Sequence, residues 1–250
     1  MKVIEYGKEN EKVVILLHGG GLSWWNYKEV AEHLQDDYHV VIPILDGHAD
    51  SDRDFTGIEA NANEIISYID GNFGGSVDMI GGLSLGGQIL VEILAQREDI
   101  CQTALIESAL ILPMKMTHRL VAPMMDMSYG LIKKEWFAKL QFASLKMKTE
   151  LYDEYYCDTC KITKENMTAF LKANSAYTAK DSISGSKARV YICVGQKEQG
   201  SMIRSARKLH ELIPNSSLEI LQKLYHGEYS INHAEEYAAK VKELIEGSCS

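Results

Sequence analysis

The chain has 250 residues, of which 46% are hydrophobic and 24% charged, the composition of a globular protein large enough to bury a substantial core. Its 35 acidic residues outnumber 26 Lys and Arg, and the net charge of −9 argues against nucleic acid or an anionic membrane as the main partner. No apolar stretch approaches the ~20 residues of a membrane span. Residues 1–7 lack the apolar region of a secretory signal, so we expect a cytoplasmic protein.

Five cysteines are scattered along the chain, at positions 101, 157, 160, 193 and 249. Cys157 and Cys160 have the spacing of a metal knuckle or a redox pair. A zinc site would need two further ligands at matching spacing, and a thioredoxin-like pair would need a strand-to-helix junction; the sequence offers neither. We therefore interpret both as incidental reduced thiols, and predict no metal and no cofactor.

Short apolar runs alternate with helix-length segments. The predicted strands are residues 13–17, 39–43, 77–80, 103–106, 190–194 and 218–221, with 2–6 as a candidate edge strand. The predicted helices are residues 27–34, 58–69, 88–96, 202–213 and 232–245, the last with Asn232 and Glu235 as an N-terminal capping pair. This alternation predicts an α/β fold: a mainly parallel sheet with helices on both faces.

Residues 111–181 interrupt that rhythm. No strand pattern occurs there, residues 163–173 read as a helix, and seven of the ten methionines fall in it. Apolar residues recur at helical spacing at Trp136, Leu140, Ala143, Met147 and Leu151. The segment is too long for an ordinary connection. We predict a core of residues 1–110 and 182–250 and a helical cap or lid of residues 111–181.

The segment Gly82-Leu83-Ser84-Leu85-Gly86 follows a predicted strand and precedes a predicted helix. A nucleophile on such a tight turn needs flanking glycines, because side chains there would collide with neighbouring backbone. The turn exposes the Ser84 hydroxyl, and the backbone N–H of Leu85 then points at a reacting carbonyl oxygen. A plain glycine-rich turn with a capping serine is the alternative.

His18-Gly19-Gly20-Gly21 ends the first central strand. Consecutive glycines allow close approach of backbone N–H groups, which can form the second arm of an oxyanion hole. We predict Gly20 for this role, with Gly21 beside it. The glycine spacing matches neither common nucleotide-binding pattern, so phosphate binding ranks lower.

A serine nucleophile needs a base and an acid that orients the base. Of the eight histidines, His226 is the best-placed base, because it follows the last predicted strand; His18 and His48 are predicted to brace loops. Glu198 lies just past the strand before it and is the predicted acid, because both its chain order and its position in a loop match the arrangement serine, acid, histidine. Glu107 is the rival, and Glu228 a weaker one.

These segments together resemble the α/β-hydrolase superfamily, in particular its members with a helical cap. The resemblance rests on the glycine loop after His18, the Ser84 turn, Gly195-x-x-Glu198 and His226-Gly227-Glu228. Residues 43–51 also look like the family's P-D-L-x-G-H-G-x-S loop, with Ile44 and Ala49 as departures. A glutamate stands at 198 where the family more often has aspartate.

The resemblance implies an α/β-hydrolase fold and a carboxylesterase-like serine hydrolase acting on a small, apolar ester. Ser84 would attack the carbonyl carbon, His226 would move the proton, Glu198 would hold the imidazole, and Gly20 and Leu85 would receive the oxyanion. Alternatives are C–C bond, lactone or thioester hydrolysis, or a slow or non-catalytic ligand receptor. The oligomeric state is left open.

The substrate pocket is predicted beneath the cap. Gly21, Trp24 and Met124 are its candidate lining residues, and the cap's methionines and aromatics would give it a soft, adaptable surface. An equally good interpretation is that these methionines fill the cap's own small core. Trp24 and Trp25 are predicted at the junction of cap and core or at the pocket mouth.

Overall fold

The computed structural model describes residues 1–247 and contains a seven-stranded sheet. Its strands are β1 (Val3–Tyr6), β2 (Val13–Leu17), β3 (His39–Pro43), β4 (Val77–Leu83), β5 (Cys101–Glu107), β6 (Arg189–Gly195) and β7 (Ser216–Leu221). They lie in the order β1-β3-β2-β4-β5-β6-β7; β1 pairs antiparallel with β3, and all other pairs are parallel. All seven predicted strands are present, and the α/β prediction is confirmed.

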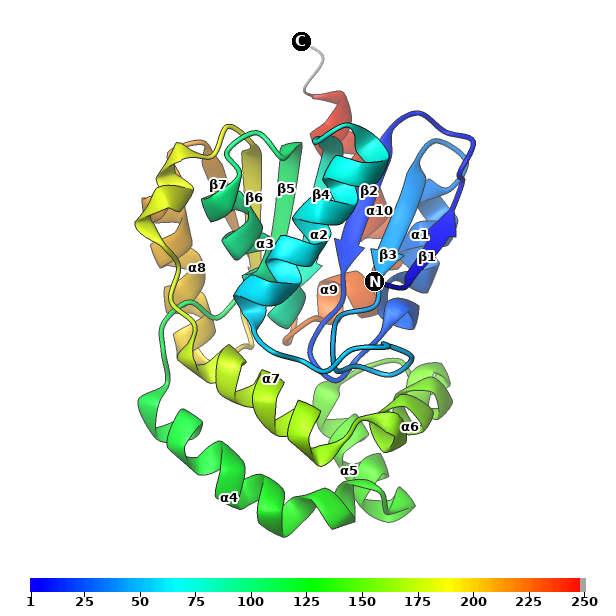
Figure 1. Ribbon diagram of the computed structural model, residues 1–250, viewed down its shortest axis with the longest axis vertical. Helices are drawn as coiled ribbons and strands as arrows, with labels where there is room; N and C mark the ends of the chain where they lie inside the picture. The colour runs from blue at the N-terminus through cyan, green and yellow to red at the C-terminus, as the bar shows by residue number, and fades with distance from the viewer. Residues whose placement is uncertain (248–250) are drawn as a thin grey trace.

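The sheet is covered on both faces because its central strands are apolar on both faces. Along β2, Val14 and Leu16 belong to one buried cluster and Ile15 and Leu17 to another. Helices α2 (Ile58–Phe73), α3 (Leu85–Gln96) and α8 (Gly200–Leu212) pack on one face; the 3-10 helix η1 (Trp24–Tyr27), α1 (Lys28–Leu34), α9 (Glu228–Asn232) and α10 (Ala234–Glu246) pack on the other (Figure 1). The hydrophobic core therefore forms two layers, one on each side of the sheet.

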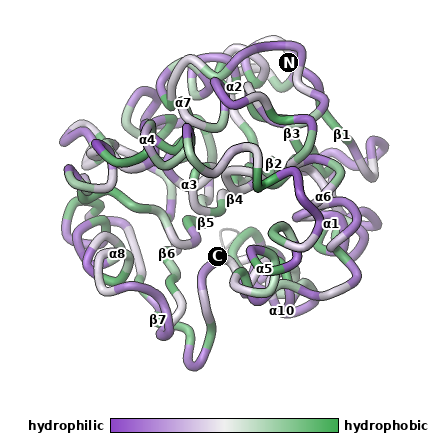
Figure 2. Tube along the Cα trace, turned by 90° about the horizontal axis from the view of Figure 1, so that it is seen from below, coloured by the Kyte–Doolittle hydropathy of each residue, from purple (hydrophilic) through white to green (hydrophobic). Residues whose placement is uncertain are grey.

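Between β5 and β6 the chain forms helices only. These are α4 (Lys115–Ile132), α5 (Glu135–Leu145), η2 (Thr149–Leu151), α6 (Tyr152–Lys161), α7 (Lys164–Ala176) and η3 (Asp181–Gly185). Helices α4 to α7, called the cap segment below, lie across the carboxyl ends of the strands (Figure 1). From the cap side, α4 and α7 lie on the side of α2 and α3, and α5 and α6 lie on the side of α1 and α10 (Figure 2).

One buried side chain joins both ends of the cap segment to the sheet-flanking helix α3. The Gln88 amide nitrogen donates to the carbonyl oxygens of Leu110 (2.6 Å) and Asn174 (2.9 Å). The Asn174 amide donates back to Gln88 Oε1 at 2.9 Å. The polar groups of this buried amide are therefore satisfied by the two chain segments that enter and leave the cap.

The predicted capping pair at Asn232 and Glu235 is wrong. The helix breaks at His233, which is the N-cap residue of α10, and no side-chain cap bond forms there. Asn232 instead accepts a hydrogen bond from the Lys148 N–H (3.1 Å) and donates to the Lys146 carbonyl (2.7 Å). A tertiary contact with the cap segment has taken the side chain that local sequence assigned to the helix end.

The apolar residues at helical spacing from Trp136 to Leu151 do not all lie in one helix. Helix α5 ends at Leu145, and Trp136 and Leu140 are 63% and 64% exposed. The buried positions of α5 are Ala138 and Phe142 instead. The helix therefore packs through two side chains other than the regularly spaced Trp136 and Leu140. Among the described helices, none is both long and apolar enough to cross a bilayer.

Candidate active site

Ser84 stands on a sharp turn between β4 and α3. Its backbone has φ +53°, a left-handed conformation that a non-glycine residue adopts only under constraint. The constraint comes from neighbours: a Cβ at Gly86 would collide with the carbonyl oxygen of Leu17, and the Ser84 N–H donates to the Glu107 carbonyl at 2.9 Å. The turn thus presents the Ser84 hydroxyl above the carboxyl edge of the sheet.

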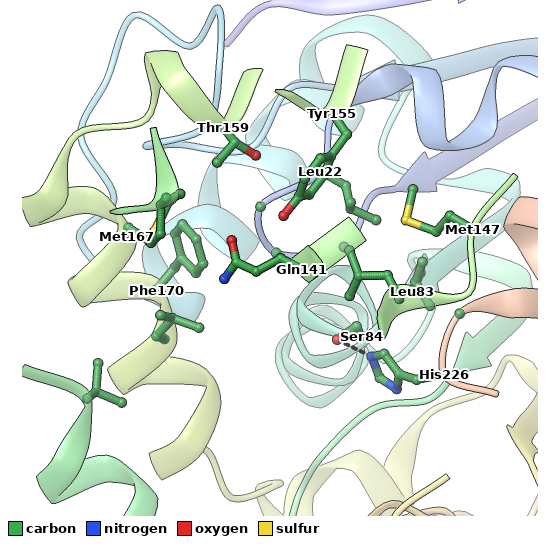
Figure 3. Close-up of a pocket in the computed structure, with 18 of the residues that line it drawn as sticks. Leu22, Leu83, Ser84, Gln141, Met147, Tyr155, Thr159, Met167, Phe170 and His226 are labelled. Atoms are coloured by element: carbon green, nitrogen blue, oxygen red, sulfur yellow. Dashed lines mark hydrogen bonds between the residues drawn. The ribbon is translucent and has the colours of Figure 1, made fainter. Parts of the chain in front are cut away.

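Two hydrogen bonds connect Ser84, His226 and Glu198, which come from three separate loops at that edge. His226 Nε2 lies 3.0 Å from Ser84 Oγ (Figure 3), and His226 Nδ1 lies 2.7 Å from Glu198 Oε2. Ser84 and His226 are 142 residues apart in the sequence. This is the geometry of a nucleophile, a base and an orienting acid.

His226 and Glu198 each stabilise the charged form of the other. Desolvation lowers the pKa of His226, but the hydrogen bond and charge of Glu198 outweigh it, and the net pKa lies above the ordinary value of 6.5. Burial raises the pKa of Glu198, whereas His226, Ser108 and the Gly195 N–H lower it, and the net pKa lies below 4.5. Glu198 is therefore ionised at neutral pH and holds the His226 Nδ1 proton.

Ser108 is a functional candidate that the sequence analysis missed. Its hydroxyl donates to Glu198 Oε1 at 2.6 Å, and the Gly195 N–H donates to the same oxygen at 2.7 Å. Ser108 is 2% exposed and has φ +55°, so a strained backbone aims its hydroxyl at the carboxylate. Its position directly after β5, at the carboxyl edge, is the signal that could have marked it.

The two alternative acids, Glu107 and Glu228, make their hydrogen bonds away from His226. Glu107 is buried beside α9 and accepts a 3.4 Å hydrogen bond from the Ser230 N–H, while its Oε2 has no partner. Burial, opposed by the Ser230 hydrogen bonds and supported by the Glu198 charge, raises the pKa of Glu107 to about 7. Glu228 accepts from the Tyr225 N–H at 2.8 Å, within its own loop. Neither carboxyl is bonded to His226.

The glycine loop after β2 lies against the start of α3. A Cβ on Gly20 would touch the Leu85 side chain at 3.5 Å, so the two predicted oxyanion-hole residues are neighbours. The Gly19 N–H donates to Asn26 Oδ1 at 3.2 Å, which fixes the loop. Burial lowers the pKa of His18 to about 3, and this neutral ring bridges the Gly19 carbonyl and the Leu45 N–H. His18 braces the loop, as predicted.

A cavity of about 450 Å³ lies between this edge and the cap segment (Figure 3). Ser84, His226, Gly20 and Gly21 line its sheet side. Apolar side chains dominate the rest of the wall: Leu22, Leu83, Val121, Met124, Met125, Ile132, Leu145, Met147, Met167, Phe170, Leu171 and Ile231. Four cap methionines therefore line the cavity, whereas Met116 and Met127, 77% and 83% exposed, face solvent.

The two tryptophans after the glycine loop differ. Trp24 is half-buried and is not among the residues that line this cavity, so its predicted pocket role is not supported by the geometry. Trp25 is buried, and its indole N–H donates to Asp158 Oδ2 of α6 at 2.8 Å. Trp25 thus lies at the junction of cap and core, which was one of its two predicted places.

The described residues contain no group of three or more histidine, cysteine, aspartate or glutamate side chains placed to hold a metal ion. Cys157 and Cys160 lie one turn apart in α6 with free thiols, and Cys101 and Cys193 are buried and free. Cys249 lies outside the described residues.

The chain belongs to the alpha/beta hydrolase family, whose model matches residues 14–239. The match spans strands β2 to β7 and the cap segment between them, and membership of this family supports hydrolase activity on a small molecule. No significant match is found among curated proteins.

Solved structures show the same fold at low sequence identity. A thermophilic esterase from Thermogutta terrifontis superposes with a TM-score of 0.81 at 15% identity, covering 100% of this chain and 94% of the other. An esterase from Exiguobacterium antarcticum gives 0.82 at 18% identity, with 98% and 94% coverage. An enol-lactonase from Burkholderia xenovorans LB400 gives 0.75 at 14% identity, with 98% and 95% coverage.

Proposed function

We propose that this hydrolase is a serine esterase that cleaves a small, mainly apolar ester through Ser84, His226 and Glu198. The observation that carries the proposal is the pair of hydrogen bonds from Ser84 Oγ to His226 Nε2 and from His226 Nδ1 to Glu198 Oε2, 3.0 and 2.7 Å long. Their position at the floor of an apolar cavity favours an uncharged ester as substrate.

In the proposed reaction, Ser84 Oγ attacks the ester carbonyl carbon while His226 Nε2 accepts its proton. Glu198 keeps the other proton on Nδ1 and stabilises the imidazolium that forms. The N–H groups of Leu85 and Gly20 receive the oxyanion, each worth about 3–4 kcal/mol of barrier in comparable sites. The imidazolium then returns a proton to the departing alcohol, and water cleaves the acyl-enzyme by the same steps.

We also propose the division of the chain into a core of residues 1–110 and 182–250 and a cap of residues 111–181. The cap segment supplies most of the apolar cavity wall, so it would select the substrate, while the sheet edge would carry out the reaction. This division of labour is supported by the separate places of the two sets of residues in Figure 3.

The test combines covalent labelling with turnover. A fluorophosphonate probe should label the wild-type protein on Ser84, and Ser84→Ala should lose both labelling and at least about 10³-fold of kcat for p-nitrophenyl esters of graded chain length. Ser67→Ala, an exposed serine on α2, is the matched control and should label normally. Equal labelling of Ser84→Ala would refute the assignment of the nucleophile.

The same panel separates the alternatives. A receptor or regulatory protein with this fold would give at most a single burst of product, whereas an esterase turns over continuously. Steady turnover of lactones or thioesters with no turnover of open-chain esters would replace the esterase proposal by the corresponding hydrolase.

A further inference from the structure

Three polar groups gather at the cap side of the otherwise apolar cavity. Gln141 of α5 and Tyr155 and Thr159 of α6 all line it, and Figure 3 shows their polar groups on the side of the pocket opposite Ser84 and His226. Tyr155 and Thr159 are 7% and 4% exposed. These residues take no part in the proposed reaction.

The Gln141 amide oxygen is buried and has no hydrogen-bond partner. The Ser128 hydroxyl of the same wall, by contrast, donates to the Met124 carbonyl at 2.7 Å. A buried carbonyl oxygen without a partner costs about 1–3 kcal/mol, so proteins seldom leave one in a wall of leucine and methionine. A group of the bound ligand would satisfy it.

The charge of the wall identifies the kind of group. The described residues that line the cavity include no lysine, arginine, aspartate or glutamate, and His226 is engaged by Glu198. A carboxylate or an ammonium entering this end would therefore be buried without a counter-ion, which is far costlier than burying a neutral polar group. The ligand group must be neutral and must donate a hydrogen bond.

We propose that the cap end of the cavity is a hydroxyl-recognition subsite formed by Gln141, Thr159 and Tyr155. The substrate is an apolar ester that carries a neutral hydroxyl on the part remote from the scissile carbonyl. A hydroxyl donates to Gln141 Oε1 and accepts from the neighbouring amide or hydroxyl groups, so it satisfies the subsite with one atom. This inference rests on the proposed esterase function for the orientation of the substrate.

The test uses matched pairs of p-nitrophenyl esters, an n-alkanoate and the corresponding ω-hydroxyalkanoate, over graded chain lengths. The measured quantity is the ratio of kcat/KM for the hydroxylated ester to that for the alkyl ester. At the chain length where the wild-type ratio is highest, Gln141→Leu should lower the ratio about tenfold, because the hydroxyl loses its acceptor. Gln141→Met, unbranched and of similar size, should do the same, which guards against a folding defect in one variant.

Ser144→Ala is the matched control, an exposed serine on the same helix α5, and should leave the ratio unchanged. A ratio that is the same in the wild type and both Gln141 variants at every chain length would overturn the subsite. Calorimetric binding of the same ester pairs to Ser84→Ala gives an independent decision. One outcome is that the wild type hydrolyses no ester while Ser84→Ala binds the hydroxylated ester more tightly than the alkyl ester and loses this preference when Gln141 is also replaced. In that case the esterase proposal fails and the subsite stands.

Discussion

The carboxyl edge of the sheet and the cap segment above it hold their polar groups in different ways. At the edge, Glu198 accepts hydrogen bonds from Ser108, Gly195 and His226, and both His226 nitrogens are engaged. In the cap wall of the cavity, the Gln141 oxygen has no partner and most contacts are apolar. The three residues of the proposed reaction are therefore bonded to one another, whereas the cap wall contains a buried polar atom without a hydrogen bond from any described residue.

This difference suits the sheet edge to the proposed reaction and the cap wall to the choice of substrate. Proton transfer needs fixed distances, and a network of short hydrogen bonds on strained backbone fixes them. Selectivity between related esters needs a wall whose shape and polarity suit the bound group, and long flexible side chains supply that wall. The predictions below test the two halves of this contrast, the edge first.

The largest expected effect in this series comes from the acid. Glu198→Gln should lower kcat/KM by about 10²- to 10⁴-fold, because the neutral amide no longer fixes the His226 tautomer or stabilises the imidazolium. Glu107→Gln should change it by less than about tenfold, since burial already raises the pKa of Glu107 to about 7. Steady-state kinetics on one ester decides: the reverse pattern would make Glu107 the acid.

The pH profile follows from the His226 pKa. The His226 ring must be neutral to accept the Ser84 proton, and Glu198 holds the pKa of that ring above 6.5. We therefore expect kcat/KM to rise with pH, and the midpoint of the rise to lie above pH 6.5. Below that midpoint, activity should fall about tenfold per pH unit. Residual activity of Glu198→Gln should have its midpoint at lower pH; an unchanged midpoint would contradict the coupling.

Ser108 tests whether the network at the edge matters beyond its three central residues. Ser108→Ala should reduce kcat/KM about tenfold, because Glu198 loses one of two donors to the same oxygen. Ser108→Gly should lose as much activity as Ser108→Ala, because it also removes the hydroxyl. It does so without backbone strain, since glycine adopts the φ of +55° freely. If Ser108→Gly recovers full kcat/KM, only the backbone matters. The acid-limb midpoint in the pH profile is the second readout, which a purely structural defect would not move.

The smallest expected effect lies at the junction of the two regions. Trp25→Phe removes the buried hydrogen bond to Asp158, and urea unfolding should show a loss of about 1–3 kcal/mol. Turnover should change only a few-fold, because Trp25 does not line the cavity. Trp24→Phe, at a half-buried ring, should cost less stability. If Trp24→Phe lowers the free energy of unfolding more than Trp25→Phe does, the assignment of Trp25 as the stabilising contact between cap and core is wrong.

Much of the edge could be predicted from sequence because backbone requirements constrain it. The strands are continuous apolar runs, and the turn at Ser84 needs Gly82 and Gly86 in places where a Cβ would collide with backbone. The loops of Glu198 and His226 follow strands, so parallel topology brings them to one edge. Ser108 escaped notice because its role depends on a contact 90 residues away.

The cap segment was predicted less well because tertiary contacts decide its details. Helical spacing picked out Trp136 and Leu140, which are exposed, whereas the side chain that packs inward is Phe142, in edge-on contact with Tyr152. In a thin layer that covers a cavity, an apolar residue can face solvent, cavity or neighbouring helix, and periodicity does not distinguish the three. Gln141 reads as an ordinary helix residue until its burial in the cavity wall is seen.

The Gln88 clamp has a consequence for motion of the cap segment. The same side chain holds both stems of the cap segment, and it lies one helical turn after Ser84 on α3. A motion of the cap segment that moved Leu110 or Asn174 away from Gln88 would break these buried hydrogen bonds and disturb the helix that begins directly after Ser84.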